Sequence, residues 1–172
     1  MREYSLGGAQ LTVAGATTLN SIGNVAATAA AAGTTGGVNL EFIRHWVGQN
    51  ANATSAQQRI EFGSYVVGGG FGTFTAATPA KLKLQDPASV IVGSTAVKQG
   101  SSGINASSEG TPTRSAIWDD VFNVLNGYLK VNTPAETEIL VQGTASLGAY
   151  LWFPTAPATL TSWTWGQNFR EV

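Results

Sequence analysis

Strict alternation of apolar and polar side chains is the feature of this sequence that most limits its fold. Residues 56–67 read "AQQRIEFGSYVV", and their side chains divide between two faces. One face holds Ile60, Phe62, Ser64 and Val66, and the other holds Arg59, Glu61 and Tyr65. A period of two residues is that of a β-strand. We therefore expect a strand here, with one buried face and one wet face.

The same alternation recurs along the chain, in segments 80–84, 136–142, 147–154 and 160–169. Segment 39–49 is rich in β-formers but alternates less cleanly, and turn signals containing Gly or Pro separate the segments. The pattern predicts one all-β domain over residues 1–172, built as an antiparallel β-sandwich or jelly roll with long loops. Within it, residues 1–39 form an N-terminal strand or arm and an Ala-rich connection (24–37), and residues 40–172 form the sandwich body.

Residues 115–126 allow two interpretations. Ile117, Trp118, Val121, Phe122 and Leu125 follow helical spacing, and Ser115 and Gly127 are suitable as the first and last residues of a helix. The middling helix propensity of residues 121–124 favours instead a strand from about Phe122 onward, with Asp119 and Asp120 in the preceding turn. Both alternatives stay open from sequence alone.

Composition excludes several classes of function. Only 11% of the residues are charged and the net charge is −1, with no basic cluster of the kind that binds nucleic acid. The absence of cysteine excludes disulfides, thiol nucleophiles and zinc–thiolate sites. No apolar run is long enough to span a bilayer, and the first ten residues lack the apolar core of a secretory signal. We expect a protein made in a cytosol that binds neither nucleic acid nor membrane.

The sequence offers little catalytic chemistry. His45 is the single histidine, lies mid-strand without a G-x-S-x-G elbow, and is interpreted as structural or surface-exposed. The close acidic pairs are Asp119 with Asp120 and Glu136 with Glu138; they are interpreted as a solvated rim, and a paired-carboxylate or calcium site is the alternative. We expect no catalytic residue, no cofactor and no metal ligand.

The tryptophans invite two interpretations. Buried, each removes roughly 150–250 Å² from water and anchors a core; exposed on a sheet, Trp163, Trp165 or Trp152 forms a platform for sugar rings. We favour the first for the last strand. The predicted core anchors are Trp163, Trp165, Phe169, Phe62, Ile60, Leu151 and Phe153.

Residues 52–89, "NATSAQQRIEFGSYVVGGGFGTFTAATPAKLKLQDPAS", resemble a pattern in small structural proteins of tailed bacteriophages. The segments "FNVLNGYLKVNTPAETEILV" (122–141) and "LGAYLWFPTAP" (147–157) resemble the later strands of such proteins, and the terminal "SWTWG" (162–166) resembles the "TWTWG"-like strand that closes them. The likeness covers about residues 40–172. It implies a virion component assembled in the host cytoplasm. That component would be a capsid decoration (cement) or minor capsid-associated protein, whose partners are the major capsid protein or other virion proteins.

Such a protein acts by association alone and assembles as a small homo-oligomer. Edge strands, the termini and the long loop 93–113 are expected to reach neighbouring subunits. The candidate interface residues are Met1, Arg2, Glu3, Tyr4, Ser101, Ser102, Ile104 and Trp152.

Three other functions compete with the virion role. The low charge and edge strands also fit a self-assembling fibre or surface-array subunit, whose contacts are open-ended. A carbohydrate-binding module would use the tryptophans as its platform. A glycosidase would use the acidic pairs, and it is the alternative with the least support in the sequence.

Overall fold

The computed structural model describes residues 2–23, 38–51, 54–66, 71–97, 100–133 and 147–172. These residues form twelve strands and no helix. The strands are β1 (Arg2–Leu11), β2 (Thr17–Gly23), β3 (Leu40–Gln49), β4 (Gln57–Val66), β5 (Thr75–Ala76), β6 (Ala80–Lys81), β7 (Val92–Gly93), β8 (Ser101–Ile104), β9 (Arg114–Asn123), β10 (Tyr128–Val131), β11 (Leu147–Phe153) and β12 (Trp163–Glu171).

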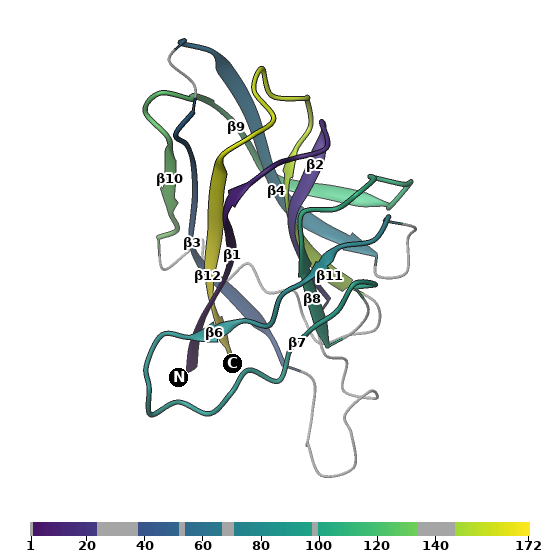
Figure 1. The fold of residues 1–172 in the computed structure, drawn as a ribbon. Helices are drawn as coiled ribbons and strands as arrows, with labels where there is room; N and C mark the ends of the chain where they lie inside the picture. Colours follow the sequence, from purple (N-terminus) through teal and green to yellow (C-terminus); the bar gives the residue numbers. More distant parts are fainter. Residues whose placement is uncertain (1, 24–37, 52–53, 67–70, 98–99, 134–146) are drawn as a thin grey trace.

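The strands form two sheets that face each other (Figure 1). Sheet A has five strands in the order β10-β3-β12-β1-β6. Sheet B has seven, in the order β5-β8-β2-β11-β4-β9, with β7 added beside β8. Every pairing is antiparallel except the short β7–β8 pair. The predicted antiparallel β-sandwich is confirmed, and a jelly-roll connectivity stays a prediction.

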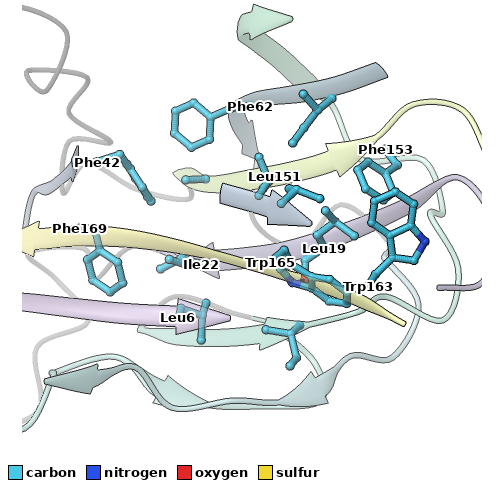
Figure 2. Packing of buried hydrophobic residues seen from close by; sticks show 14 of the residues in the cluster. Leu6, Leu19, Ile22, Phe42, Phe62, Leu151, Phe153, Trp163, Trp165 and Phe169 are labelled. Atoms are coloured by element: carbon cyan, nitrogen blue, oxygen red, sulfur yellow. Dashed lines mark hydrogen bonds between the residues drawn. The ribbon is translucent and has the colours of Figure 1, made fainter. Parts of the chain in front are cut away.

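The core lies between the two sheets and is dominated by aromatic rings (Figure 2). All seven predicted core anchors are buried: Trp163, Trp165, Phe169, Phe62, Ile60, Leu151 and Phe153. Trp163 packs edge-on against Phe153 of sheet B, with ring centroids 4.9 Å apart. The Trp165 indole N–H donates to the Leu19 carbonyl at 3.0 Å and to Asn20 Oδ1 at 2.9 Å, which satisfies its buried polar atom from the opposite sheet. The two terminal tryptophans therefore join the sheets and are not a surface platform.

A β-bulge explains the unclean alternation of β3. Asn168 pairs with Arg44 whereas Phe169 pairs with Phe42, so that Ile43 is one extra residue in β3. An extra residue moves the following side chains to the other face of a strand. It places His45 among the buried side chains, on the same face as Phe42.

A second bulge explains why residues 115–126 resemble a helix. Phe62 pairs with Trp118 and Gly63 with Ala116, which leaves Ile117 as the extra residue. The helical alternative is wrong, because β9 is a continuous strand from Arg114 to Asn123. The placement of Asp119 and Asp120 in a turn is also wrong, since both lie within that strand.

The N-terminal residues form an inner strand of the sandwich. β1 lies between β12 and β6, and its Tyr4 and Leu6 are buried in the core. Of the two expectations for these residues, a strand or an arm, the structure has the strand, because β1 pairs with β12 and with β6 inside the subunit. The termini lie side by side, with Arg2 opposite Glu171 (Figure 1).

Three further expectations differ from the structure or lie outside it. The face of β4 predicted to be wet buries Glu61 and Tyr65. In segment 80–84 only Ala80–Lys81 is a strand. The Ala-rich connection 24–37 and the predicted strand 136–142, with the acidic pair Glu136 and Glu138, lie outside the described residues.

Candidate interaction surfaces

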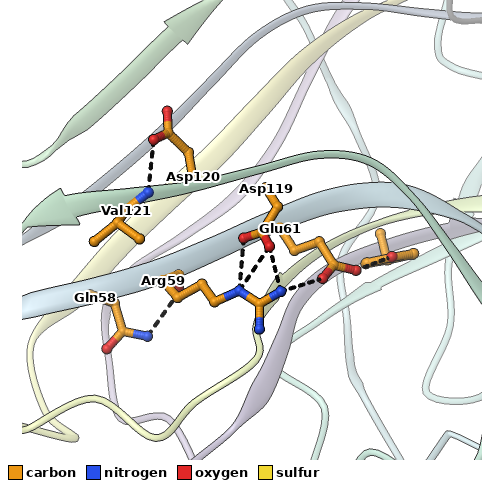
Figure 3. Close-up of polar contacts among 7 residues, drawn as sticks. Gln58, Arg59, Glu61, Asp119, Asp120 and Val121 are labelled. Carbon is orange, nitrogen blue, oxygen red and sulfur yellow. Dashed lines mark hydrogen bonds and ion pairs between the residues drawn. The ribbon is translucent and has the colours of Figure 1, made fainter.

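The outer face of sheet B carries an ion-pair network across β4 and β9 (Figure 3). Arg59 Nε donates to both carboxylate oxygens of Asp119, at 2.8 and 2.9 Å, and its Nη2 donates to the same group. Arg59 Nη2 also lies 3.7 Å from Glu61 Oε2. The Tyr150 hydroxyl donates to the other oxygen of Glu61. Each carboxylate therefore has a partner within the subunit.

The electrostatics of this network oppose acid–base catalysis. The hydrogen bonds from Arg59 lower the pKa of Asp119 below its ordinary value. Burial, together with the adjacent Glu61 carboxylate, raises the pKa of Tyr150. Asp119 is thus held as an anion and Tyr150 as a neutral donor, whereas a general acid or base needs a pKa near the working pH. The arrangement joins β4 to β9 and moves the pKa values of Asp119 and Tyr150 away from neutrality.

Arg114 covers the aromatic side chains next to this network. Its guanidinium lies 4.0 Å from the ring centroid of Trp152, 5.4 Å from that of Tyr150 and 5.1 Å from that of Phe71. It also pairs with Glu109. Trp152, a candidate interface residue, is therefore partly covered within its own subunit.

The positions of the three tryptophans do not favour the sugar-binding alternative. Trp163 and Trp165 are buried between the sheets, and Trp152 lies beneath Arg114. Stacking against a sugar ring needs an open aromatic face. Trp163 and Trp165 offer none in the structure, and Arg114 covers one face of the Trp152 ring.

The predicted interface residues in loop 93–113 are buried within the subunit. Ser101, Ser102 and Ile104 belong to β8, which pairs with β2, β5 and β7. The Ser102 hydroxyl donates to the Ala77 carbonyl at 2.6 Å. Their assignment as surface contacts is wrong, because the segment expected to be a loop contributes a strand to sheet B.

The predicted interface residues at the N-terminus divide into three groups. Tyr4 is buried; its hydroxyl donates to the Pro87 carbonyl at 3.2 Å, so its assignment to the surface is wrong. Glu3 is partly exposed and accepts from Arg170 Nε at 2.9 Å, and Arg2 is exposed. Met1 lies outside the described residues.

His45 is a buried core residue. Its Nδ1 lies 2.9 Å from Gln167 Nε2, and its ring packs against those of Phe62 and Trp118, with centroids 4.4 and 5.3 Å away. Burial, with the nearby Lys130 charge, lowers the pKa of His45 to about 3. A neutral imidazole enclosed by aromatic rings has a structural role.

Within the described ranges, no three His, Asp or Glu side chains are grouped to hold a metal ion. No described helix has the length and apolar character needed to cross a membrane.

The outer face of sheet A is organised in rows that cross the strands. The first row runs from β10 to β1 as Leu129, Trp46, Gly166 and Gly7, each directly opposite the next. The second runs as Val131, Arg44, Asn168, Ser5 and Ala80. The third is Glu41, Arg170 and Glu3. We call these the Trp46 row, the Arg44 row and the Arg170 row.

Side chains project from one side of this face, and a groove lies on the other. Leu129 and Val131 are 65% and 59% exposed, so the β10 side presents apolar side chains to solvent. On the β1 side there is a groove of about 340 Å³, with Gly7 and Gly8 in its lining. It is lined by Ser5, Leu6, Gly7, Gly8, Ala9, Trp46, Ala77, Thr78, Ala80, Thr164 and Trp165.

Charges on this face are paired within the subunit. Arg170 pairs with Glu3 and lies 3.8 Å from Glu41. The Asn168 amide, in the orientation that satisfies its neighbours, accepts from Arg44 Nε at 2.8 Å and donates to Ser5 Oγ at 3.2 Å. Arg44 also stacks on Trp46, 5.4 Å from the ring centroid. A partner that covers this face would bury no isolated charge from these rows.

Sequence reasoning missed this face. Trp46 and Leu129 are far apart in sequence and become neighbours only through the register of β3 and β10. No local pattern in the sequence could identify this face.

Comparisons with protein families, with curated proteins and with solved structures found no match to this chain.

Proposed function

We propose that this chain is a non-enzymatic structural protein of a tailed-bacteriophage virion, and that it acts as a decoration (cement) protein on the head. The resemblance of residues 40–172 to small phage structural proteins supports this role. The observation that carries the proposal is a contrast between the acidic side chains and the exposed apolar ones. The carboxylates Glu61, Asp119 and Glu109 are engaged inside the subunit, whereas the open surface presents large apolar side chains.

The end of the molecule that holds both termini is the proposed contact with the shell. The Leu82 amide donates to the Glu3 carbonyl at 2.9 Å, which fixes the turn after β6 beside the N-terminal strand. Leu84 in this turn is 88% exposed, and Val172 at the end of the chain is also exposed. Large apolar side chains this exposed are typical of a protein contact. Many copies on a symmetric shell add weak contacts of this kind through avidity.

The test uses heads of the phage that encodes the chain, assembled without this gene. Added protein is expected to co-sediment with the heads, to saturate at a fixed copy number and to raise the temperature at which the heads lose their DNA. Leu84→Asp is expected to weaken this binding, and Leu125→Asp, a matched exposed leucine elsewhere, is expected to leave it unchanged. Heads that bind none of the wild-type protein would overturn the proposal.

A further inference from the structure

The outer face of sheet A has large side chains on one half and small ones on the other. In the Trp46 row, Leu129 and Trp46 occupy β10 and β3, and Gly166 and Gly7 occupy β12 and β1. A line parallel to the strands, between β3 and β12, divides the row into these halves. The position of Leu129 relative to this line mirrors that of Gly7, and the position of Trp46 mirrors that of Gly166.

We propose that this face binds a second copy of the chain about a two-fold axis that lies along that line. Such an axis maps β10 onto β1 and β3 onto β12 of the facing copy. It brings Leu129 of each protomer over the groove that Gly7 of the other protomer lines. Two-fold contacts are self-complementary in this way, because one patch supplies both the projection and the recess.

Charge complementarity points to the same occupant. In the Arg170 row, Glu41 lies on β3 and Arg170 on β12. The proposed axis therefore places Glu41 of one protomer opposite Arg170 of the other, twice in the dimer. It likewise places Arg44 opposite Asn168, a cation opposite an amide that already accepts from an arginine. Opposite-sign groups that face each other fix the register of an interface and suppress other partners.

The geometry disfavours a sugar as the occupant of this face. The Trp46 ring lies over Gly166, whose added Cβ would come within 2.1 Å of Trp46 Cζ2. Arg44 stacks on the same ring at 5.4 Å. The backbone of Gly166 therefore takes up one side of the Trp46 ring and Arg44 lies against the ring, which serves as one wall of the groove.

This inference deepens the proposed function, since it names the surface through which the expected homo-oligomer forms. Self-association is measured on the purified chain without shells. A dimer that does not bind heads would overturn the decoration role alone, and a monomer that binds heads would overturn the dimer alone.

The first experiment is sedimentation equilibrium of the full chain over a wide concentration range. The wild type is expected to reach a dimer and to stop there. Leu129→Asp, at a side chain 65% exposed, is expected to weaken the dimer at least about tenfold by burying a charge over the groove. Leu84→Asp is the matched control and is expected to dimerise as the wild type does. A wild type that remains monomeric, or a Leu129→Asp dimer of unchanged affinity, would overturn the inference.

The second experiment tests the axis and does not depend on a disruptive substitution. The chain contains no cysteine, so the pair Val131→Cys and Ser5→Cys introduces the only thiols. Within one protomer these positions are three strand spacings apart, roughly 14 Å at about 4.8 Å per spacing. The proposed axis instead places position 131 of one protomer opposite position 5 of the other, and the reverse. A bismaleimide shorter than the separation within one protomer is expected to link two chains in the double variant, and in neither single variant. A wild-type-like dimer that gives no such link would overturn the two-fold arrangement.

Discussion

Trp46 lies directly against the backbone of Gly166. The two residues are opposite each other on β3 and β12, and a Cβ atom at position 166 would lie 2.1 Å from Trp46 Cζ2. Non-bonded carbon atoms attract only at separations of about 3.5–4.0 Å. The missing side chain at Gly166 is therefore what allows the indole to cover β12.

Replacing Gly166 by Ala is expected to lower the free energy of unfolding by about 1–3 kcal/mol, because the indole must shift off the sheet. Urea unfolding measures this change. In a Trp46→Ala background the same substitution is expected to be nearly neutral, since the obstructing ring is gone. Gly48→Ala is the matched control on β3, where an added Cβ meets nothing within 4 Å. Equal losses from Gly166→Ala in the two backgrounds would contradict this explanation.

Acid is expected to destabilise the fold through His45. Burial and the Lys130 charge lower its pKa to about 3, against an ordinary value of 6.5 in the unfolded chain. Between these values the unfolded chain binds a proton that the folded chain does not, so stability falls as the pH falls from 6.5 towards 3. From about pH 7.5 to about pH 5 the loss attributable to His45 is on the order of 2 kcal/mol.

The measurement is chemical unfolding at a series of pH values, with His45→Gln as the comparison. Glutamine is polar, uncharged and close to histidine in size, so it keeps a partner for Gln167 without binding a proton. The difference in unfolding free energy between the two proteins should change over this pH range. Parallel pH profiles would show that another group is responsible.

Arg114 and Arg59 are expected to differ in their contribution to stability. Arg114 stacks on three rings and pairs with Glu109, and both side chains of that pair are under 20% exposed. Arg59 is 46% exposed, and ion pairs at exposed positions contribute little to stability. Arg114→Ala should lower the free energy of unfolding by about 2 kcal/mol, and Arg59→Ala should lower it clearly less. Arg114→Lys should recover only part of the loss, because lysine lacks the planar group.

The strands that sequence could predict are those whose alternation is unbroken. β4, β11 and β12 each keep a period of two, and their anchors Ile60, Leu151 and Trp165 are buried as expected. β3 and β9 depart from that period because each contains one extra residue, at Ile43 and Ile117. A bulge is a property of a strand pair. The sequence of one strand therefore shows only an irregular alternation of apolar and polar side chains.

The candidate surfaces depend even more on register. Glu61 and Tyr65 fell on the face of β4 expected to be wet, yet both are buried, because side chains of β2 and β11 reach them. Tyr65 accepts from the Ser21 hydroxyl at 2.7 Å, and Glu61 accepts from the Tyr150 hydroxyl. These partners lie 44 and 89 residues away in sequence. Pairings at such separations depend on the whole sheet order and leave no trace in local composition.

Removing residues 2–10 is expected to prevent folding. β1 supplies the buried Tyr4 and Leu6 and is the neighbour of the central strand β12. Circular dichroism of the truncated chain should lose the β-sheet signal, whereas removal of residue 1 alone should leave it intact. A substitution that keeps the strand, Leu6→Ala, should lower the free energy of unfolding by about 2–5 kcal/mol. A folded truncated chain would show that β1 is dispensable.

Trp165→Phe is expected to destabilise the protein more than Trp163→Phe. The Trp165 indole N–H donates to the Leu19 carbonyl and to Asn20 Oδ1, and both hydrogen bonds are buried between the sheets. Phenylalanine keeps an aromatic ring but removes the donor, which leaves a buried amide oxygen without that partner, at about 1–3 kcal/mol in addition to the lost volume. The Trp163 N–H donates at 2.7 Å to the Thr159 carbonyl in a partly buried position, where water can replace it. Thermal or urea unfolding of the two variants checks the order. Equal losses would mean that ring volume, and not the hydrogen bonds between the sheets, determines the contribution of these two residues.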